Sequence, residues 1–233
     1  MKARVDLGVA ALLTLGAVVA SVGAALLGGR LIESGPNWWR SLVARPYLAL
    51  AELGVDMGHP AFWVLPSVAL LAGTIWAYAV TRTFAIPRPG PIVLAALSFG
   101  AVVFVETEAA PLWLTSLVPQ TDGHERAELL LRITEAVFVV AAISSGALAL
   151  SLGFGRRTIG VAIVAALSAA VASAIAYILL DIVGLRVGSW DGAMVKVALA
   201  STAAGAIAGG AMLGRALRET KGHVPIRPGL GPT

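Results

Sequence analysis

Long stretches without a charged side chain constrain this sequence most. Leu7–Gly29 and Thr158–Leu180 each run for 23 residues without Asp, Glu, Lys or Arg, and Ala61–Val80 does so for 20 residues. In an α-helix, about 20 apolar residues cross the hydrocarbon core of a bilayer. Charged residues make up only 13% of the chain, whereas soluble domains carry about 25%. The sequence therefore predicts an integral membrane protein and argues against a soluble domain or a nucleic-acid-binding protein.

Six predominantly apolar stretches, two of which contain acids, give the predicted fold class, an all-α polytopic integral membrane protein with six transmembrane helices. The other three are Pro91–Val118, Ile133–Phe154 and Val197–Leu213. We expect residues 1–221 to form a single transmembrane domain. The apolar part of Leu7–Gly29 exceeds the 7–15 residues usual in a signal peptide, which favours a retained first helix. Residues 222–233 are rich in Pro and Gly and are predicted to be a disordered cytoplasmic tail.

The segment between the first two predicted helices, residues 30–60, is the longest non-spanning stretch. Arg40, Arg45 and Pro46 interrupt it too often for a transmembrane helix. An amphipathic segment in the outer interface explains it better, with a short helix that starts at Pro46 and ends at Gly54.

The distribution of basic residues predicts the orientation. With both termini in the cytoplasm, ten Lys and Arg residues fall on the inner side and seven on the outer side. Cytoplasmic loops carry the excess of positive charge. We therefore expect a protein of the cell membrane with cytoplasmic N- and C-termini.

Tryptophan supports this orientation, because Trp and Tyr gather at both membrane–water interfaces. The predicted outer anchors are Trp38, Trp39, Trp63, Trp113 and Trp190. Trp76 and Tyr78 fit the inner interface.

Two acids interrupt the third predicted helix. Glu106 and Glu108 fall within about 5 Å of the midpoint of Pro91–Val118 at a rise of ~1.5 Å per residue. An acid at that depth costs about 2.5–3.5 kcal/mol on insertion scales. Residues two apart point about 200° from each other on a helix, and Pro111 predicts a kink that would free a carbonyl beside both acids.

Two more acids are predicted at similar height in the outer half. Glu135 falls in the first turn of the fourth predicted helix, and Asp181 ends the fifth. One interpretation is structural: Glu135 and Asp181 are solvated at the interface, while Glu106 or Glu108 pairs with a neighbouring helix. The other is a proton- or cation-responsive site that opens to the outside.

Small residues at four-residue spacing predict close helix packing within the membrane. The last helix places Gly205 and Gly209, and also Gly210 and Gly214, at this spacing. The fifth helix has a matching row that includes Ala166 and Ala170. These faces pack inside the protein in one interpretation and dock another subunit in the other.

The residue types favour a protein without catalytic activity, metal or cofactor. There is no cysteine, so thiolate metal sites and cysteine nucleophiles are excluded. His59 lies in Gly58-His59-Pro60, but the second histidine and further bases that a lipid phosphatase needs are missing at suitable spacing. Lys196 lies at the outer end of its predicted helix, too far from the midplane for a retinal Schiff base.

Two functions therefore remain foremost. The first is a non-catalytic subunit of a larger membrane complex that packs through small-residue faces, with the lipid bilayer and other membrane subunits or a second copy as partners. The second is a small transporter or channel that uses Glu106 and Glu108. An enzyme that acts on lipid headgroups at the outer surface is the least supported.

Overall fold

The computed structural model describes residues 61–108 apart from 85 and 87, residues 124–183 and residues 192–221, together with 16–18, 37, 38, 41, 45 and 52. This part of the chain is helical and contains no strand, which confirms the all-α prediction for it. Of the first predicted span only residues 16–18 are described, and of the predicted interfacial segment only residues 37, 38, 41, 45 and 52. The predicted tail, residues 222–233, lies wholly outside the described residues.

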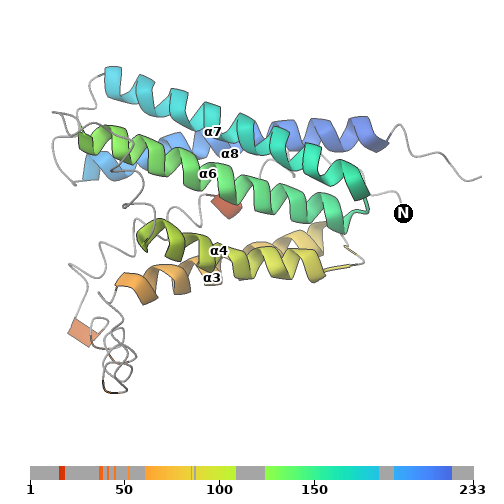
Figure 1. Cartoon of the computed structure of the whole chain (residues 1–233), viewed down its shortest axis with the longest axis horizontal. Helices are drawn as coiled ribbons and strands as arrows, with labels where there is room; N and C mark the ends of the chain where they lie inside the picture. The colour runs from red at the N-terminus through yellow and green to blue at the C-terminus, as the bar shows by residue number, and fades with distance from the viewer. Residues whose placement is uncertain are drawn as a thin grey trace, which may run out of the picture.

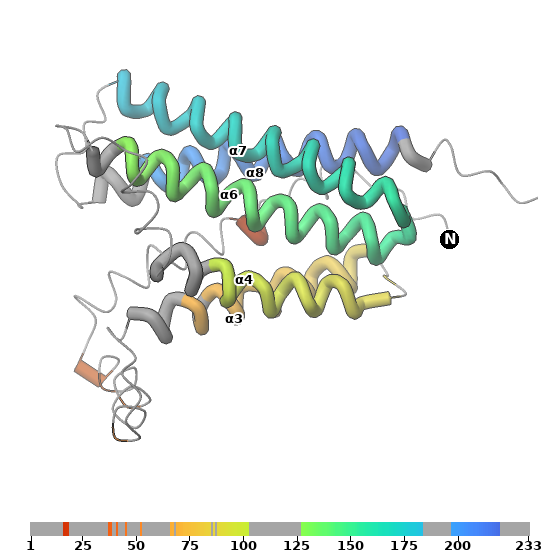
Figure 2. Tube along the Cα trace, in the orientation of Figure 1, coloured from red at the N-terminus to blue at the C-terminus, as the bar shows by residue number. Residues whose placement is uncertain are grey.

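Five long helices form the described bundle (Figure 1). They are α3 (Ala61–Phe84), α4 (Gly90–Glu108), α6 (His124–Ser151), α7 (Thr158–Ile182) and α8 (Gly192–Lys221). Helix α3 packs against α4, α4 against α6, α6 against α7, and α8 against both α7 and α6. Helices α6, α7 and α8 therefore form a three-helix group, and α3 and α4 form a pair on the other side of α6 (Figure 2).

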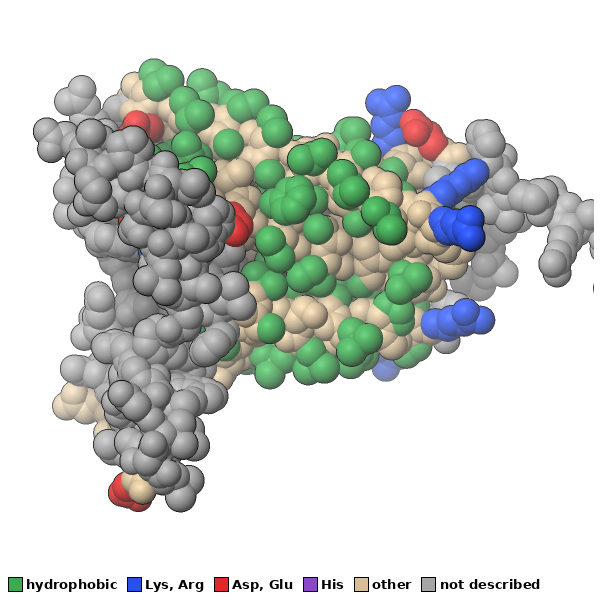
Figure 3. All heavy atoms as spheres, in the orientation of Figure 1, with side chains coloured by type: hydrophobic (Ala, Val, Ile, Leu, Met, Phe, Trp, Pro, Cys, Tyr) green, Lys and Arg blue, Asp and Glu red, His purple; other side chains and the backbone are tan. Residues whose placement is uncertain are grey.

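On α7, small residues face the interior of the bundle and large apolar residues face outward. The interior face carries small residues such as Ala165, Ala169 and Ser173, each 0% exposed. The outer face carries Leu167 and Ile175, each about half exposed. Figure 3 shows such apolar side chains spread over the middle of the visible face. An outer surface of this kind suits lipid, where close backbone contact rather than the hydrophobic effect holds helices together.

Three helices of the described part are long and apolar enough to cross a membrane: Ala127–Ser151, Gly155–Ile182 and Val197–Glu219. The part of α4 whose side chains are described, Gly90–Val102, is apolar but shorter than these three helices. These findings are compatible with the predicted membrane protein.

Two helices begin earlier than the apolar pattern predicts. Helix α6 starts at His124 rather than Ile133, and α8 starts at Gly192 and ends at Lys221 rather than spanning Val197–Leu213. The polar residues His124, Glu125 and Arg126 therefore belong to helix α6. Glu, Arg and Leu all favour helix, so the charged sequence before Ile133 extends the helix although it ends the apolar run.

A tight turn joins α6 to α7. Gly153 has φ +84° and Gly155 has φ +56°, values that side chains with a Cβ rarely adopt. The amide of Phe154 donates to the Ala149 carbonyl at 3.1 Å, and a short 3₁₀ helix, η1 (Gly155–Arg157), leads into α7. The turn brings two arginines to the end of the bundle.

The aromatic residues are only partly where the interface pattern predicts them. Trp38 is 68% exposed, whereas Trp39, Trp113, Trp190 and the side chain of Trp63 lie outside the described part. Trp76 is only 5% exposed and packs against Phe99, with ring centroids 5.2 Å apart. Trp76 is therefore a core residue between α3 and α4, and not the interfacial anchor that the sequence predicts.

Candidate functional site

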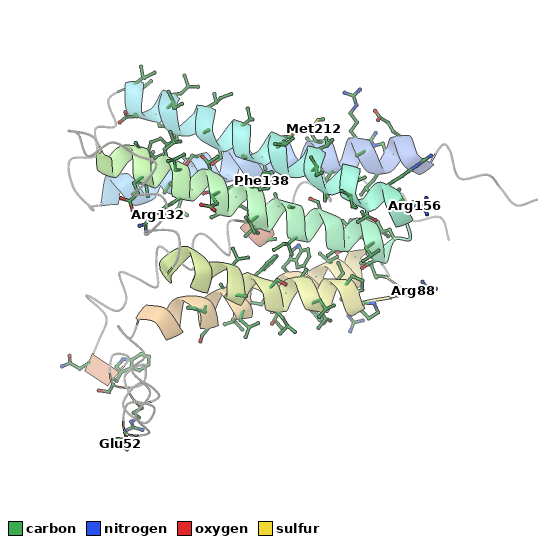
Figure 4. All side chains as sticks on the ribbon, in the orientation of Figure 1. Glu52, Arg88, Arg132, Phe138, Arg156 and Met212 are labelled. Carbon is green, nitrogen blue, oxygen red and sulfur yellow. The ribbon has the colours of Figure 1, made fainter. Side chains whose placement is uncertain are left out.

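Three charged side chains of α6 share one face. Glu128, Arg132 and Glu135 are spaced by four and three residues, and side chains at this spacing are neighbours on a helix. An Arg132 Nη2 hydrogen donates to Glu128 Oε1. We call these three residues the charged stripe. Figure 4 shows Arg132 at the end of the bundle opposite to Arg88 and Arg156.

Two polar atoms of the charged stripe are buried without a hydrogen-bond partner among the described residues. They are Nε of Arg132 and Oε2 of Glu135. The side chain of Arg132 as a whole is 32% exposed, and that of Glu128 is 18% exposed. Burying a polar group without a partner is unfavourable, so this face is suited to take up a further polar group, a proton or a cation.

Glu135 lies farther from the start of its helix than the sequence predicts. Because α6 begins at His124, Glu135 is in the fourth helical turn and not in the first. It lies eight residues inside the candidate span Ala127–Ser151, which is about 12 Å along the helix axis. The prediction that Glu135 falls in the first turn of its helix is therefore wrong, because the helix starts nine residues before Ile133.

Glu106 and Glu108 lie in the last described turn of α4. Helix α4 packs against α6, and the end of α4 that carries both acids lies beside the first half of α6 (Figure 1). Their side chains and Pro111, with its predicted kink, lie outside the described part. The fold therefore brings the backbone of both acids to the same end of the bundle as the charged stripe.

Asp181 is separated from Glu135. Gly146 of α6 lies beside Ala162 of α7, where an added Cβ would be 3.4 Å from the Ala162 Cβ. In this antiparallel pair Asp181 is level with the start of the Ala127–Ser151 span, about two turns from Glu135. Asp181 is partly exposed near the end of α7, so the structure does not bring the two acids together.

Small-residue faces of α7 and α8 meet inside the bundle. A Cβ on Gly205 would lie 2.5 Å from the Ala169 carbonyl oxygen, and one on Gly209 would lie 2.8 Å from the Ala169 Cβ and 3.0 Å from the Ala165 carbonyl oxygen. The other four predicted packing residues are also buried: Gly210, Gly214, Ala166 and Ala170. The contact with Gly205 and Gly209 is made by a different row of α7 from the predicted one, namely Ala165, Ala169 and Ser173.

Two buried hydroxyls beside this contact were missed by sequence reasoning. Ser173 and Thr202 are each 0% exposed, and their hydroxyl oxygens have no hydrogen-bond partner among the described residues. The Ser173 Cβ borders Gly205, and Thr202 precedes Gly205 by one turn. By contrast, the Ser201 hydroxyl donates to the Val197 carbonyl at 2.9 Å. The only sequence signal was the continuation of the small-residue row of α7 by a serine.

The described residues contain no group of three or more His, Asp or Glu residues that could hold a metal ion. Comparison of the chain with family models, curated proteins and solved structures gave no match. Functional reasoning therefore rests on the chain itself. Its most unusual chemical feature is the charged stripe, which places an ion pair and a second carboxylate on a helix that is long and apolar enough to span a membrane.

Proposed function

We propose that the chain is a polytopic protein of the cell membrane with six transmembrane helices and cytoplasmic termini. The apolar outer surface supports this proposal, as does the uneven distribution of arginine. Six exposed arginines lie at one end of the bundle: Arg82, Arg88, Arg156, Arg157, Arg215 and Arg218. The opposite ends of α6, α7 and α8 carry three bases, Arg126, Arg132 and Lys196, together with the acids Glu125, Glu128, Glu135 and Asp181. An arginine-rich end is the cytoplasmic end under the positive-inside rule.

The function that the site supports best is a small transporter or channel with a proton- or cation-responsive carboxylate in the outer half of the bundle. One observation carries this proposal: Oε2 of Glu135 is buried within a candidate transmembrane helix and has no hydrogen-bond partner among the described residues. Ionisable residues at membrane depth are costly and usually mark ion or proton pathways. The structure supports Glu135 as the first responsive group, with Glu106 and Glu108 on the adjoining end of α4 as further ones.

Flux through liposomes tests this proposal. The purified protein is reconstituted, and proton and monovalent-cation uptake are followed with pH- and ion-sensitive dyes. We expect Glu135→Gln to reduce flux at least tenfold, because the substitution keeps the shape of the side chain and removes its charge. Glu219→Gln is the matched control, since Glu219 pairs with Arg215 on the exposed end of α8. Equal flux in both variants and the wild type would show that Glu135 has no role in transport.

A non-catalytic subunit of a membrane complex is the second proposal, and the partial exposure of Arg132 favours it. A polar side chain of a neighbouring subunit could reach the exposed part of the Arg132 side chain, as polar groups do between helices in lipid. The protein is purified in mild detergent, and stoichiometric partners are identified by mass spectrometry. Arg132→Gln should release such a partner, whereas Arg218→Gln, at the other end of the bundle, should retain it. Retention by both variants would exclude the charged stripe as the contact.

A further inference from the structure

The six exposed arginines form a collar around one end of the described bundle. Arg82 is in the last turn of α3, Arg88 precedes α4, and Arg156 and Arg157 form most of η1. Arg215 and Arg218 lie in the last turns of α8. Because helices consecutive in the chain run antiparallel, these elements meet at one end, where Figure 3 shows the blue side chains. We call the six residues the arginine collar.

Little negative charge offsets the arginine collar. Among the described residues, the only acid at this end is Glu219, which accepts a hydrogen bond from Arg215 Nε at 2.8 Å. Six arginines and one glutamate leave a net charge of +5 for the described side chains there. The Arg82 guanidinium lies over the Tyr78 ring, 5.4 Å from its centroid, and this contact leaves its charge unneutralised. A concentration of positive charge next to a membrane attracts anionic headgroups.

An apolar track begins directly beside the charge. Ile159, Ile163 and Leu167 follow Arg157 on α7 at four-residue spacing, and they are 68%, 47% and 52% exposed. Residues at this spacing line one face of a helix. The track thus runs from the arginine collar along the outer surface of the bundle, in the direction that an acyl chain takes below its headgroup.

We propose that the arginine collar binds an anionic phospholipid. Arg156 and Arg157 hold the phosphate, and an acyl chain lies along Ile159, Ile163 and Leu167. Guanidinium groups donate several hydrogen bonds to phosphate oxygens, and the tight turn at Gly153 and Gly155 presents both arginines at the start of the apolar track. This proposal uses the membrane orientation proposed above and is independent of any transport by Glu135.

Native mass spectrometry of the full chain in detergent measures the binding, with phosphatidylglycerol and phosphatidylcholine added separately. We expect phosphatidylglycerol to bind more tightly, and we expect Arg156→Gln/Arg157→Gln to weaken it about 25-fold, or about fivefold per arginine. Phosphatidylcholine binding should not change. The control is Arg40→Gln/Arg45→Gln, which removes the same charge from the predicted outer loop and should leave both affinities within twofold.

Two further arms keep the result decisive. Arg156→Lys/Arg157→Lys retains the charge but not the fork of guanidinium donors, so its affinity should lie between those of the wild type and the double Gln variant. Equal unfolding temperatures of the three proteins would exclude a folding defect as the cause of the loss. Dihexanoyl phosphatidylglycerol, with its short chains, should bind at least tenfold more weakly than the long-chain lipid, because it covers less of the apolar track. Equal loss in the control double variant would overturn the site. Equal affinity of short- and long-chain lipid would overturn the apolar track.

Discussion

A Cβ on Gly205 would lie 2.5 Å from the carbonyl oxygen of Ala169, so α8 carries no side chain where it touches the backbone of α7. The same added Cβ would also lie 2.9 Å from the Ser173 Cβ and 3.1 Å from the Val137 Cγ1. Gly205 therefore lies where α6, α7 and α8 meet, and the spacing of all three helices depends on a hydrogen atom at this position.

Gly205→Ala should destabilise the bundle. Alanine favours helix over glycine by about 1 kcal/mol, but overpacking of a close contact costs about 1–3 kcal/mol. Because the nearest atoms belong to a helix backbone and cannot rotate away, we expect the packing cost to dominate and the unfolding temperature in detergent to fall. Gly160→Ala on α7 is the control, since an added Cβ there meets nothing within 4 Å. It should raise the unfolding temperature, and a similar rise for Gly205→Ala would contradict the close contact.

Gly153→Ala tests backbone conformation rather than space. Nothing lies within 4 Å of a Cβ at Gly153, but its φ of +84° is unfavourable for alanine. We expect a loss of about 1–2 kcal/mol in the free energy of unfolding, measured by denaturation in mixed micelles. Gly153→Asn should lose less, because asparagine tolerates left-handed conformations better than alanine. The reverse order of the two variants would argue against a left-handed residue at the turn.

Ser173→Ala should be neutral or stabilising. The buried Ser173 hydroxyl has no partner among the described residues, so its removal relieves an unfavourable burial of about 1–3 kcal/mol. Ser201→Ala is the comparison, because the Ser201 hydroxyl bonds to the Val197 carbonyl at 2.9 Å and should contribute a small stabilising term. Thermal denaturation of the two variants gives the sign. A clear loss for Ser173→Ala would indicate that the hydroxyl binds a water molecule or ligand.

The ion pair of the charged stripe is open to a double-mutant cycle. Arg132→Gln removes the cation that pairs with Glu128, whereas Glu128→Gln keeps an amide oxygen that can still accept from Arg132 Nη2. We therefore expect Arg132→Gln to destabilise more than Glu128→Gln. We expect a coupling free energy of about 0.5–2 kcal/mol between Glu128 and Arg132, reduced from the buried-pair range by their partial exposure. Additive single and double variants would show that the pair contributes nothing to stability.

The sequence alone was enough to predict that the described part is helical. Long stretches without charged residues rarely form any other structure. Sequence reasoning misplaced the start of α6, since the end of an apolar run is not the end of a helix when Glu, Arg and Leu follow it. That error placed Glu135 in the first turn of its helix rather than in the fourth.

The packing faces were predictable by residue type and not by partner. On α7, alanines occur at four-residue spacing in two adjoining rows, one with Ala166 and Ala170 and the other with Ala165 and Ala169. Helical periodicity alone makes the rows equivalent, and only the position of α8 decides which of them meets Gly205. The buried hydroxyls were unpredictable for the same reason, because a serine in a small-residue row is exposed or buried according to the neighbour that covers it.

The bulky apolar residues on the outer face of α7 determine which solvent favours the folded bundle. Because alanine, glycine and serine fill the contacts between α7 and α8, assembly of these two helices removes little oily area from its surroundings. In plain water, the largest gain would come from turning Ile163, Leu167 and Ile175 inward, which opposes the native arrangement. We therefore expect an amphiphile to stabilise the folded state, and we expect its removal to favour aggregation over a soluble monomer.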